Sequence, residues 1–274
     1  MVLFDFIVST RVPGTFFLRN LVERRSLLFQ LVRRDFQQRF VGSAIGWIWG
    51  LIHPLVLLVS WWFVFGVCLD VKGPKGVPYA LFIFAGMLPW LLFSDTVQRS
   101  ATSLLDQSNL ITKTVFPAEI VPVSVFLSSL VSHGLALALM ITAYAVARNQ
   151  ISIFLVLLPL YTFLVGLFAV GLGWIVASLH VFLRDTAQVL SVVLTFWFWF
   201  TPIMFTDQQF PQPLRPFLRA NPMFFAVEAY RGLLLTSSWP SLRGLGMLAL
   251  YSVAAFVAGG LFFRYMKRGF ADVL

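Results

Sequence analysis

Long runs of apolar residues, separated by polar stretches, dominate the pattern of this chain. The six longest runs are residues 48–69, 77–96, 120–147, 151–183, 189–205 and 245–263. A helix needs about 20 apolar residues to cross the hydrocarbon core of a bilayer, and each run approaches or exceeds that length. In lipid, a helix satisfies all the backbone hydrogen bonds of a single segment. The pattern therefore predicts an all-α integral membrane protein with six transmembrane helices.

Composition agrees with this assignment. Apolar residues make up 59% of the 274 residues and charged residues 11%, against about 45–50% and 25% in soluble domains. The length suits a single membrane domain over residues 1–274. The net charge of +9 does not indicate nucleic acid binding, because the charges cluster at the ends of the runs and form no continuous basic face.

The distribution of Lys and Arg predicts the orientation, since cytoplasmic loops carry an excess of both. If both termini are cytoplasmic, thirteen of the 20 Lys and Arg residues fall in inside segments. The seven in outside segments are Lys72, Lys75, Arg148, Arg215, Arg219, Arg231 and Arg243. Residues 1–15 lack a basic region followed by a cleavable apolar core, so we expect no signal peptide. We therefore expect a multi-pass protein with both termini in the cytoplasm.

Residues 20–40, which precede the first run, have the spacing of an amphipathic helix. Their apolar face comprises Leu21, Leu28, Phe29, Val32, Phe36 and Phe40. The polar side of this helix carries Arg24, Arg25, Arg33 and Arg34. Such a helix lies in the membrane interface with its Arg side chains on anionic headgroups. It acts either as a simple positive anchor or as a collar that also contacts a partner.

Two further patterns bear on packing. Gly42, Gly46 and Gly50 recur every four residues, a spacing that lets helices approach closely, within the chain or across a dimer. Residues 206–244 form a long, Pro-rich outside segment, and its apolar stretch at 223–235 is too short to span a bilayer alone. We expect short helices there that lie in the interface or re-enter the membrane.

The sequence carries no catalytic constellation. His53, His133 and His180 are far apart and lack the spacing of metal ligands, while the single Cys68 excludes a Cys-rich site. There is no phosphate loop of the G-x-x-x-x-G-K-[ST] type. We therefore expect no catalytic residue, metal or cofactor in this chain.

Ionisable residues inside the runs are scarce. Asp95 lies near the inner end of the second run, and Arg99 follows four residues later, a spacing that allows a pair on one helix face. Ion-coupled transporters usually carry carboxylates or His relays within their spans, so this scarcity argues against ion coupling. If the chain transports a solute, we expect the energy to come from another subunit.

Aromatic residues are abundant, with 30 Phe, 9 Trp and 6 Tyr. Trp and Tyr at the ends of spans are ordinary interfacial anchors. Alternatively, some face a channel, where sugar rings stack weakly on aromatic faces and slide past them. The candidate channel residues are Trp61, Trp62, Trp90, Trp197, Trp199, Phe200 and Tyr230.

Several short motifs occur in a specific order. Residues 39–55 contain R-F-V-G-S-A-I-G-W-I-W and then H-P-L, and residues 86–90 are G-M-L-P-W. N-L-I-T-K and V-F-P-A-E-I-V-P lie within residues 109–122. F-L-R-D follows at 182–185 and E-A-Y-R at 228–231. In order and spacing these motifs resemble permeases of polysaccharide ABC exporters of the type-2 class.

The resemblance implies six membrane helices, an amphipathic interface helix at 20–40 and short external helices within 206–244. It also implies a homodimer in the bacterial inner (cytoplasmic) membrane that forms a channel. Two ATP-binding cassette subunits would bind ATP and Mg²⁺ and drive export of a lipid-linked glycan such as O-antigen, capsule or teichoic acid. Export of drugs or other lipids by the same class stays open. A membrane enzyme acting on lipid-linked sugars has little support from the spread-out Asp and Glu residues.

Residues 99–119 correspond to the loop in which these permeases carry a coupling helix for the ATPase. Their own pattern predicts a short helix with one apolar side that docks into a cleft, or else an ordinary solvated loop. Phe116-Pro117 would end that element and turn the chain. The candidate coupling residues are Leu105, Asn109, Leu110, Ile111, Lys113, Phe116, Pro117 and Glu119.

Overall fold

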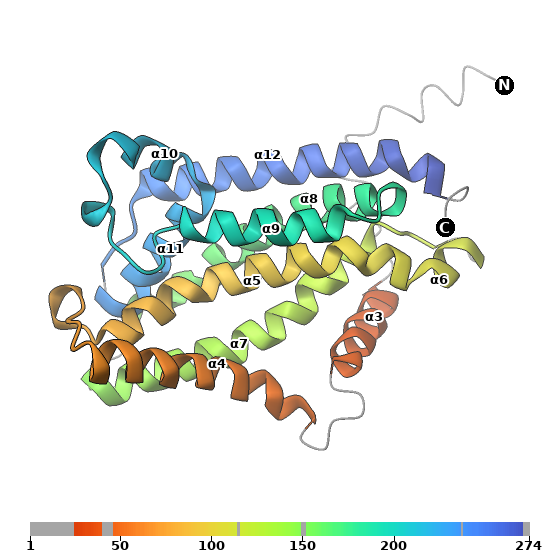
Figure 1. The fold of residues 1–274 in the computed structure, drawn as a ribbon. Coiled ribbons are helices and arrows are strands. Elements are labelled where there is room, and N and C mark those ends of the chain that lie inside the picture. The colour runs from red at the N-terminus through yellow and green to blue at the C-terminus, as the bar shows by residue number, and fades with distance from the viewer. Residues whose placement is uncertain (1–24, 40–45, 114–115, 149–151, 237, 271–274) are drawn as a thin grey trace.

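A computed structural model describes residues 25–39, 46–113, 116–148, 152–236 and 238–270, which are helical over most of their length (Figure 1). The α-helices are α3 (Arg25–Gln38), α4 (Trp49–Trp61), α5 (Tyr79–Asp106), α6 (Ser108–Lys113), α7 (Ile120–Arg148), α8 (Leu158–Phe182), α9 (Thr186–Trp199), α10 (Arg215–Ala220), α11 (Pro222–Arg231) and α12 (Leu242–Met266). The predicted all-α class is confirmed for these residues. Arg24 and Gly42 lie outside the described residues.

Five helical stretches of the described chain are long and apolar enough to cross a membrane. They are Trp49–Cys68, Tyr79–Asp106, Ile120–Arg148, Ile153–Phe182 and Leu242–Gly269. The run at 189–205 differs, because only its part up to Trp199 is α-helical, in the 14-residue α9. The structure is thus a membrane-type helical protein with five long helices and several shorter ones.

α5 extends beyond the end of its apolar run at residue 96 and continues to Asp106. Its small hydroxyl side chains bond to the preceding turn of the same helix, as Thr96 does to the Leu92 carbonyl at 2.7 Å. Ala101 and Leu104, in the last two turns, are fully buried. The helix therefore continues because hydroxyl groups such as those of Thr96 and Ser103 bond within it while its small and apolar residues still pack.

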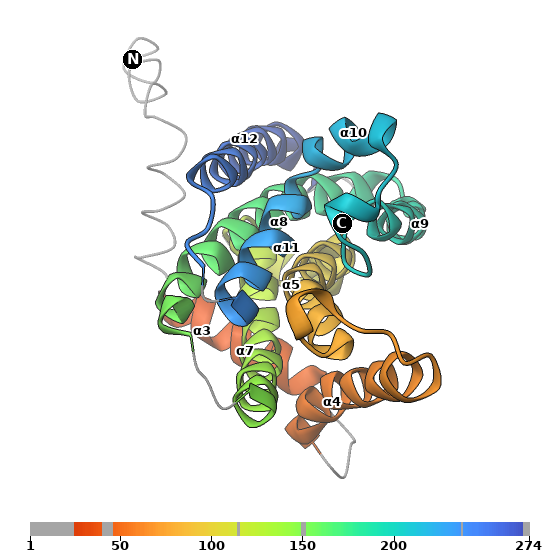
Figure 2. The ribbon, with the colours of Figure 1, turned by 90° about the vertical axis from the view of Figure 1, so that its left-hand side faces the viewer.

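α5 lies at the centre of the bundle, with α4, α7, α8, α9 and α11 around it (Figure 2). α8 packs against α5 on one side and against α12 on the other. A Cβ atom at Gly259 of α12 would collide with the Gly171 carbonyl of α8. These two helices therefore approach through backbone contact, as small residues allow in membrane proteins.

α9 and the residues that follow it, up to Met204, run beside α5. At one end, the Gln98 side chain donates to the Ala187 carbonyl at 3.2 Å. At the other end, the Tyr79 hydroxyl donates to the Met204 carbonyl. From Gln98 back to Tyr79, α5 rises about 28 Å at 1.5 Å per residue, close to the thickness of the hydrocarbon core. α9 and the irregular residues that follow it cover this whole depth.

Candidate functional site

The end of the molecule that carries α6 is built around a small apolar core. Leu104, Trp174 and Phe263 are buried in it, and Ile111 of α6 packs against it. α6 follows α5 after one intervening residue. This short link ties the position of α6 to that of the central helix.

The eight predicted coupling residues do not share one environment. Asn109 is exposed, while Leu105, Leu110, Ile111 and Phe116 are half-buried. Pro117 and Glu119 are buried, and the side chain of Lys113 lies outside the described part of the chain. Within α6, Asn109 therefore lies at the surface and Ile111 packs inward on the small core, while Pro117 and Glu119 lie inside the chain.

Glu119 anchors the beginning of α7. Its carboxylate pairs with the Lys267 ammonium at 2.7 Å, and its backbone carbonyl accepts a hydrogen bond from the Trp174 indole at 2.9 Å. Because Lys267 follows α12 and Trp174 belongs to α8, this residue joins three helices. The sequence pattern alone did not distinguish this anchoring position from a partner-facing one.

A network of four charges attaches α3 to the bundle. Asp35 pairs with Arg99 of α5 at 2.5 Å, and Arg39 pairs with Asp95 of α5 at 3.0 Å. The predicted neighbours Asp95 and Arg99 are themselves 3.8 Å apart. Ser129 of α7 donates to Asp95 at 2.6 Å. The two acidic and two basic groups are thus mutually neutralised where three helices meet.

α3 has two apolar sides rather than the single face that the pattern predicts. Leu31 is buried, whereas Phe29, placed on the apolar face from its spacing, is 68% exposed. Arg25, Arg33 and Arg34 are exposed, as expected for the polar side. Helical periodicity identifies apolar positions but does not separate those that contact protein from those that contact lipid.

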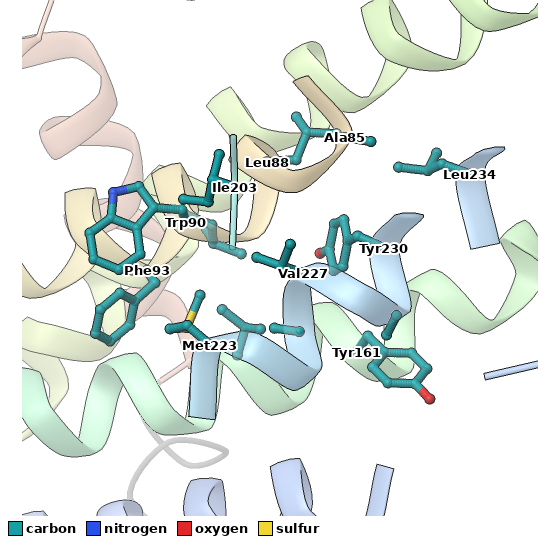
Figure 3. Close-up of a cluster of buried hydrophobic side chains, with 14 of the residues drawn as sticks. Ala85, Leu88, Trp90, Phe93, Tyr161, Ile203, Met223, Val227, Tyr230 and Leu234 are labelled. Carbon is teal, nitrogen blue, oxygen red and sulfur yellow. The ribbon is translucent and has the colours of Figure 1, made fainter. Parts of the chain in front are cut away.

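The aromatic candidates fall into buried and exposed groups. Trp90 and Trp197 are 6.4 Å apart in an edge-to-face contact, and both pack against Phe93. Trp90 is buried and Trp197 half-buried (Figure 3 shows Trp90 and Phe93 in the core cluster). Trp197 also donates to the Asn221 side chain at 2.9 Å. These residues form an internal wall between α5, α8 and α9.

Tyr230 is fully buried. Its hydroxyl lies 2.6 Å from the Thr162 hydroxyl and 3.1 Å from the imidazole of His133. This chain of polar groups joins α11 to α7 and α8 and satisfies the hydroxyl in an apolar surrounding. In the first long stretch, Trp61 is half-buried and Trp62 is exposed. Trp199 at the end of α9 and Phe200, which follows it, are exposed as well.

A groove with a cavity volume of about 540 Å³ lies between α5 and α9. Its polar lining consists of Ser94, Asp95, Gln98, Arg99, Ser191 and Thr195. Trp90, Met87, Leu91, Leu194 and Phe198 complete it. Polar side chains are costly against lipid, so a membrane protein places them toward a partner, a cavity or water. Only weak signals for this groove are visible in the sequence, because its hydroxyl residues are single polar positions within apolar runs.

Arg231, the last residue of α11, joins this helix to α5 and to residues 202–205, which follow α9. Its guanidinium donates to the carbonyls of Phe82, Pro202, Ile203 and Phe205. It also lies over the Phe82 ring, 3.6 Å from the centroid. From the sequence, this residue is one of the outside charges and the end of the E-A-Y-R motif. Its place in an apolar stretch was a signal of burial with satisfied donors.

The chain combines long apolar helices, a short helix after the central one and a polar groove between two of its helices, an arrangement that suits a transport subunit. Residues 26–235 match a family described as "ABC-2 type transporter". The chain belongs to this family. Membership makes it a membrane-embedded transport component of an ABC transporter, not the ATPase.

Similar proteins extend over nearly the whole chain. An "O-antigen export system permease protein RfbA" of Myxococcus xanthus is 29% identical over 256 residues, which cover 93% of this chain and 97% of that protein. A protein of the same description from Klebsiella pneumoniae is 24% identical over 255 residues, or 90% and 95% of the two chains. The resemblance to polysaccharide export permeases drawn from the motifs is confirmed.

Proposed function

We propose that this chain is the permease subunit of an ATP-driven exporter that moves a lipid-linked polysaccharide, such as O-antigen, across the bacterial inner membrane. The observation that carries the proposal is the groove between α5 and α9, which is lined by hydroxyl, amide and charged side chains together with the rings of Trp90 and Phe198. Hydroxyl groups exchange hydrogen bonds with sugars, and aromatic faces stack on them. The O-antigen export named for the two relatives supports the same substrate class.

In this proposal the chain crosses the membrane six times, with both termini cytoplasmic. α9 and residues 200–205 form the short fifth crossing, supported by their contacts with α5 at Gln98 and Tyr79. α3 is the interface helix, and α10 and α11 are the external helices. The end with α6 faces the cytoplasm and the end with α11 faces outward (Figure 1).

Two copies of the chain enclose the channel. α4 and α9 flank α5 on one side of the bundle (Figure 2), and both expose large apolar side chains, among them Trp62 and Trp199. Pairing this side with a second copy would close the groove against lipid. Trp90, Trp199 and Phe200 then serve as candidate channel residues, while Trp197 and Tyr230 stiffen the wall.

Two copies of an ATP-binding cassette subunit bind at α6 and supply ATP and Mg²⁺. The exposed Asn109 and the half-buried Leu110 are the proposed contact residues. A short helix inserted into a cleft is a common recognition mode. The direct succession of α5 and α6 would carry a movement of the ATPase into the wall of the channel.

Deletion of the gene in a strain known to make the polymer tests the proposal. Undecaprenyl-linked polymer should accumulate inside the deleted cells, and a plasmid copy of the gene should restore export. Normal surface polymer without internal accumulation would overturn the substrate assignment. Purified permease and ATPase, reconstituted with lipid-linked glycan or with a drug, then separate glycan export from the other activities of the class.

A further inference from the structure

A cavity of about 330 Å³ opens at the outer end of the chain, apart from the groove between α5 and α9. It lies between α11, the chain that precedes α10 and the beginning of α12. Its size is at the lower end of the range for ligand sites in proteins, about 300–1,000 Å³. Neither the family nor the relatives' names assign it a role.

Aromatic rings supply the apolar part of the lining. Phe224 and Phe225 of α11 lie edge to face, with centroids 5.3 Å apart. Trp239 belongs to the same lining, and its side chain is 75% exposed, although the ring is fixed by an edge contact with Phe154 at 5.3 Å. A Trp ring that is held in place and yet accessible is suited to stacking on a flat or weakly apolar ligand face.

Carboxylate groups supply the polar part. Asp207 pairs through Oδ2 with Arg219 at 2.5 Å, but its Oδ1 is buried and accepts no hydrogen bond from the described residues. Glu228 lines the same cavity. Partial burial and then the nearby Asp207 charge raise the pKa of the Glu228 carboxyl against the opposing charges of Arg219 and Arg231, although the residue stays largely exposed. A buried carboxylate oxygen without a donor is rare in folded proteins and is satisfied when a ligand hydroxyl reaches it.

The cation in the lining does not offer the complementary donors. The guanidinium of Arg231 is occupied by four backbone carbonyls. The spare hydrogen-bonding capacity of the cavity is therefore mostly acceptor capacity, from Asp207 and Glu228, with hydroxyl groups such as Ser238 beside it. Ligands with several hydroxyl donors fit this lining. Phosphate and other anions would need a free cation, and the guanidinium of Arg231 is already bonded to carbonyls while that of Arg219 is paired with Asp207.

We infer that this cavity binds a neutral sugar residue of a glycan at the outer face of the membrane, with the ring on Trp239 and hydroxyl groups on Asp207 and Glu228. The inference rests on the proposed export of a glycan and adds a binding site where the polymer leaves the channel. Weak binding at this place would hold the emerging chain outside and reduce its return.

Site-directed labelling tests the inference in the permease–ATPase complex in lipid nanodiscs. In a Cys68→Ser background, Ser238→Cys places a thiol in the cavity lining, and Phe217→Cys places one on α10, where Phe217 is exposed and outside the lining. The probes are neutral oligosaccharides released from the polysaccharide of the source bacterium, with glycerol phosphate as the anionic comparison. The oligosaccharides should slow maleimide labelling of S238C and leave that of F217C unchanged.

Variants in the lining assign the contacts. Asp207→Asn should weaken the protection about tenfold or more, the usual effect of losing a hydrogen bond to a charged group. Because this change also weakens the pair with Arg219, the matched control is Arg219→Gln, which breaks the same pair but keeps the carboxylate and should retain protection. Trp239→Ala should abolish protection and Trp239→Phe should largely preserve it.

Export of lipid-linked glycan by the same complex, measured in proteoliposomes, keeps the two proposals apart. Active export without protection of S238C by any neutral oligosaccharide would overturn the cavity assignment and leave the function intact. Protection by glycerol phosphate, or equal protection of F217C, would also overturn it. Failure of glycan export by a correctly assembled complex would count against the proposed function instead, whatever the labelling shows.

Discussion

At the scale of single residues, the structure depends on positions where a side chain is absent. Gly259 and Gly171 bring the backbones of α12 and α8 together, and a Cβ atom at Gly259 would overlap the facing carbonyl. Gly246, on the same helix, has nothing within 4 Å of its Cβ position. Substitutions at Gly259 and Gly246 of α12 therefore distinguish the role of glycine in close packing from its effect on helix propensity.

Gly259→Ala should lower the stability of the chain by about 1–3 kcal/mol, because a tightly packed contact must open to admit the methyl group. Gly246→Ala should be neutral or slightly stabilising, since Ala favours a helix over Gly by about 0.5–1 kcal/mol. Thermal unfolding in detergent, followed by size-exclusion chromatography, measures both. Equal melting temperatures for the two variants would contradict the close contact of α8 and α12.

Arg231 shows the opposite case, in which a long side chain occupies the space that Gly86 leaves free on α5. Its guanidinium lies 2.7 Å from where a Cβ atom at Gly86 would stand. Arg231→Lys should destabilise the chain by about 2–4 kcal/mol, because one ammonium cannot reach four carbonyls and some stay buried without donors. Arg243→Lys, at an exposed position of α12, is the control. An unchanged melting temperature in R231K would refute the role of Arg231 as a clamp.

At the scale of elements, α6 combines an internal contact with an exposed side. Leu110→Asp should uncouple ATP hydrolysis from export while leaving the chain folded, because a charge would be placed in the proposed cleft of the ATPase. Ile111→Asp should in addition lower the stability of the chain, since Ile111 packs on the small apolar core at the α6 end. Hydrolysis and export, measured together in proteoliposomes, distinguish the two. Normal export in L110D would remove the coupling assignment of α6.

The positions of the long helices along the chain could be predicted from the sequence better than the residues at which they end or the sides that they bury. Length and hydropathy located the long helices, because lipid imposes a helix on any long apolar segment. The end of α5 was placed too early, since Ser and Thr that bond to their own helix look like loop residues in a hydropathy profile. The two apolar sides of α3 were not separable, because its buried side is set by Asp35 and Arg39 pairing with distant Asp95 and Arg99.

The parts of the candidate site that depend on local sequence were predictable, whereas those that depend on contacts between distant residues were not. Motif order located α6 and the short helices α10 and α11, and the Asp95–Arg99 spacing indicated a pair. The sequence did not show that Glu119 faces Lys267, since 148 residues separate the two along the chain. The burial of Tyr230 likewise depends on Thr162 and His133 from other helices.

At the scale of the whole molecule, the two long sides of the bundle are chemically different. α12 exposes Leu250, Val253, Val257 and Leu261, which recur at helical spacing and suit contact with lipid. On the side of α5 and α9, hydroxyl, amide and charged groups line the groove. A single chain leaves this groove open, so its polar lining requires a second copy or the substrate itself to shield it from lipid.

Thr195→Trp tests this assignment, because Thr195 lines the groove and a large ring there would fill it. Export should fall severalfold while ATP hydrolysis and co-purification with the ATPase persist, since the change is distant from α6. Val257→Trp, a substitution of similar bulk on the lipid side of α12, should leave export unchanged. The export rate per hydrolysed ATP, measured for both variants in proteoliposomes, decides the outcome. If V257W impaired export as much as T195W, bulk in the membrane region alone would explain the defect, and the groove would lose its place as the path of the polymer.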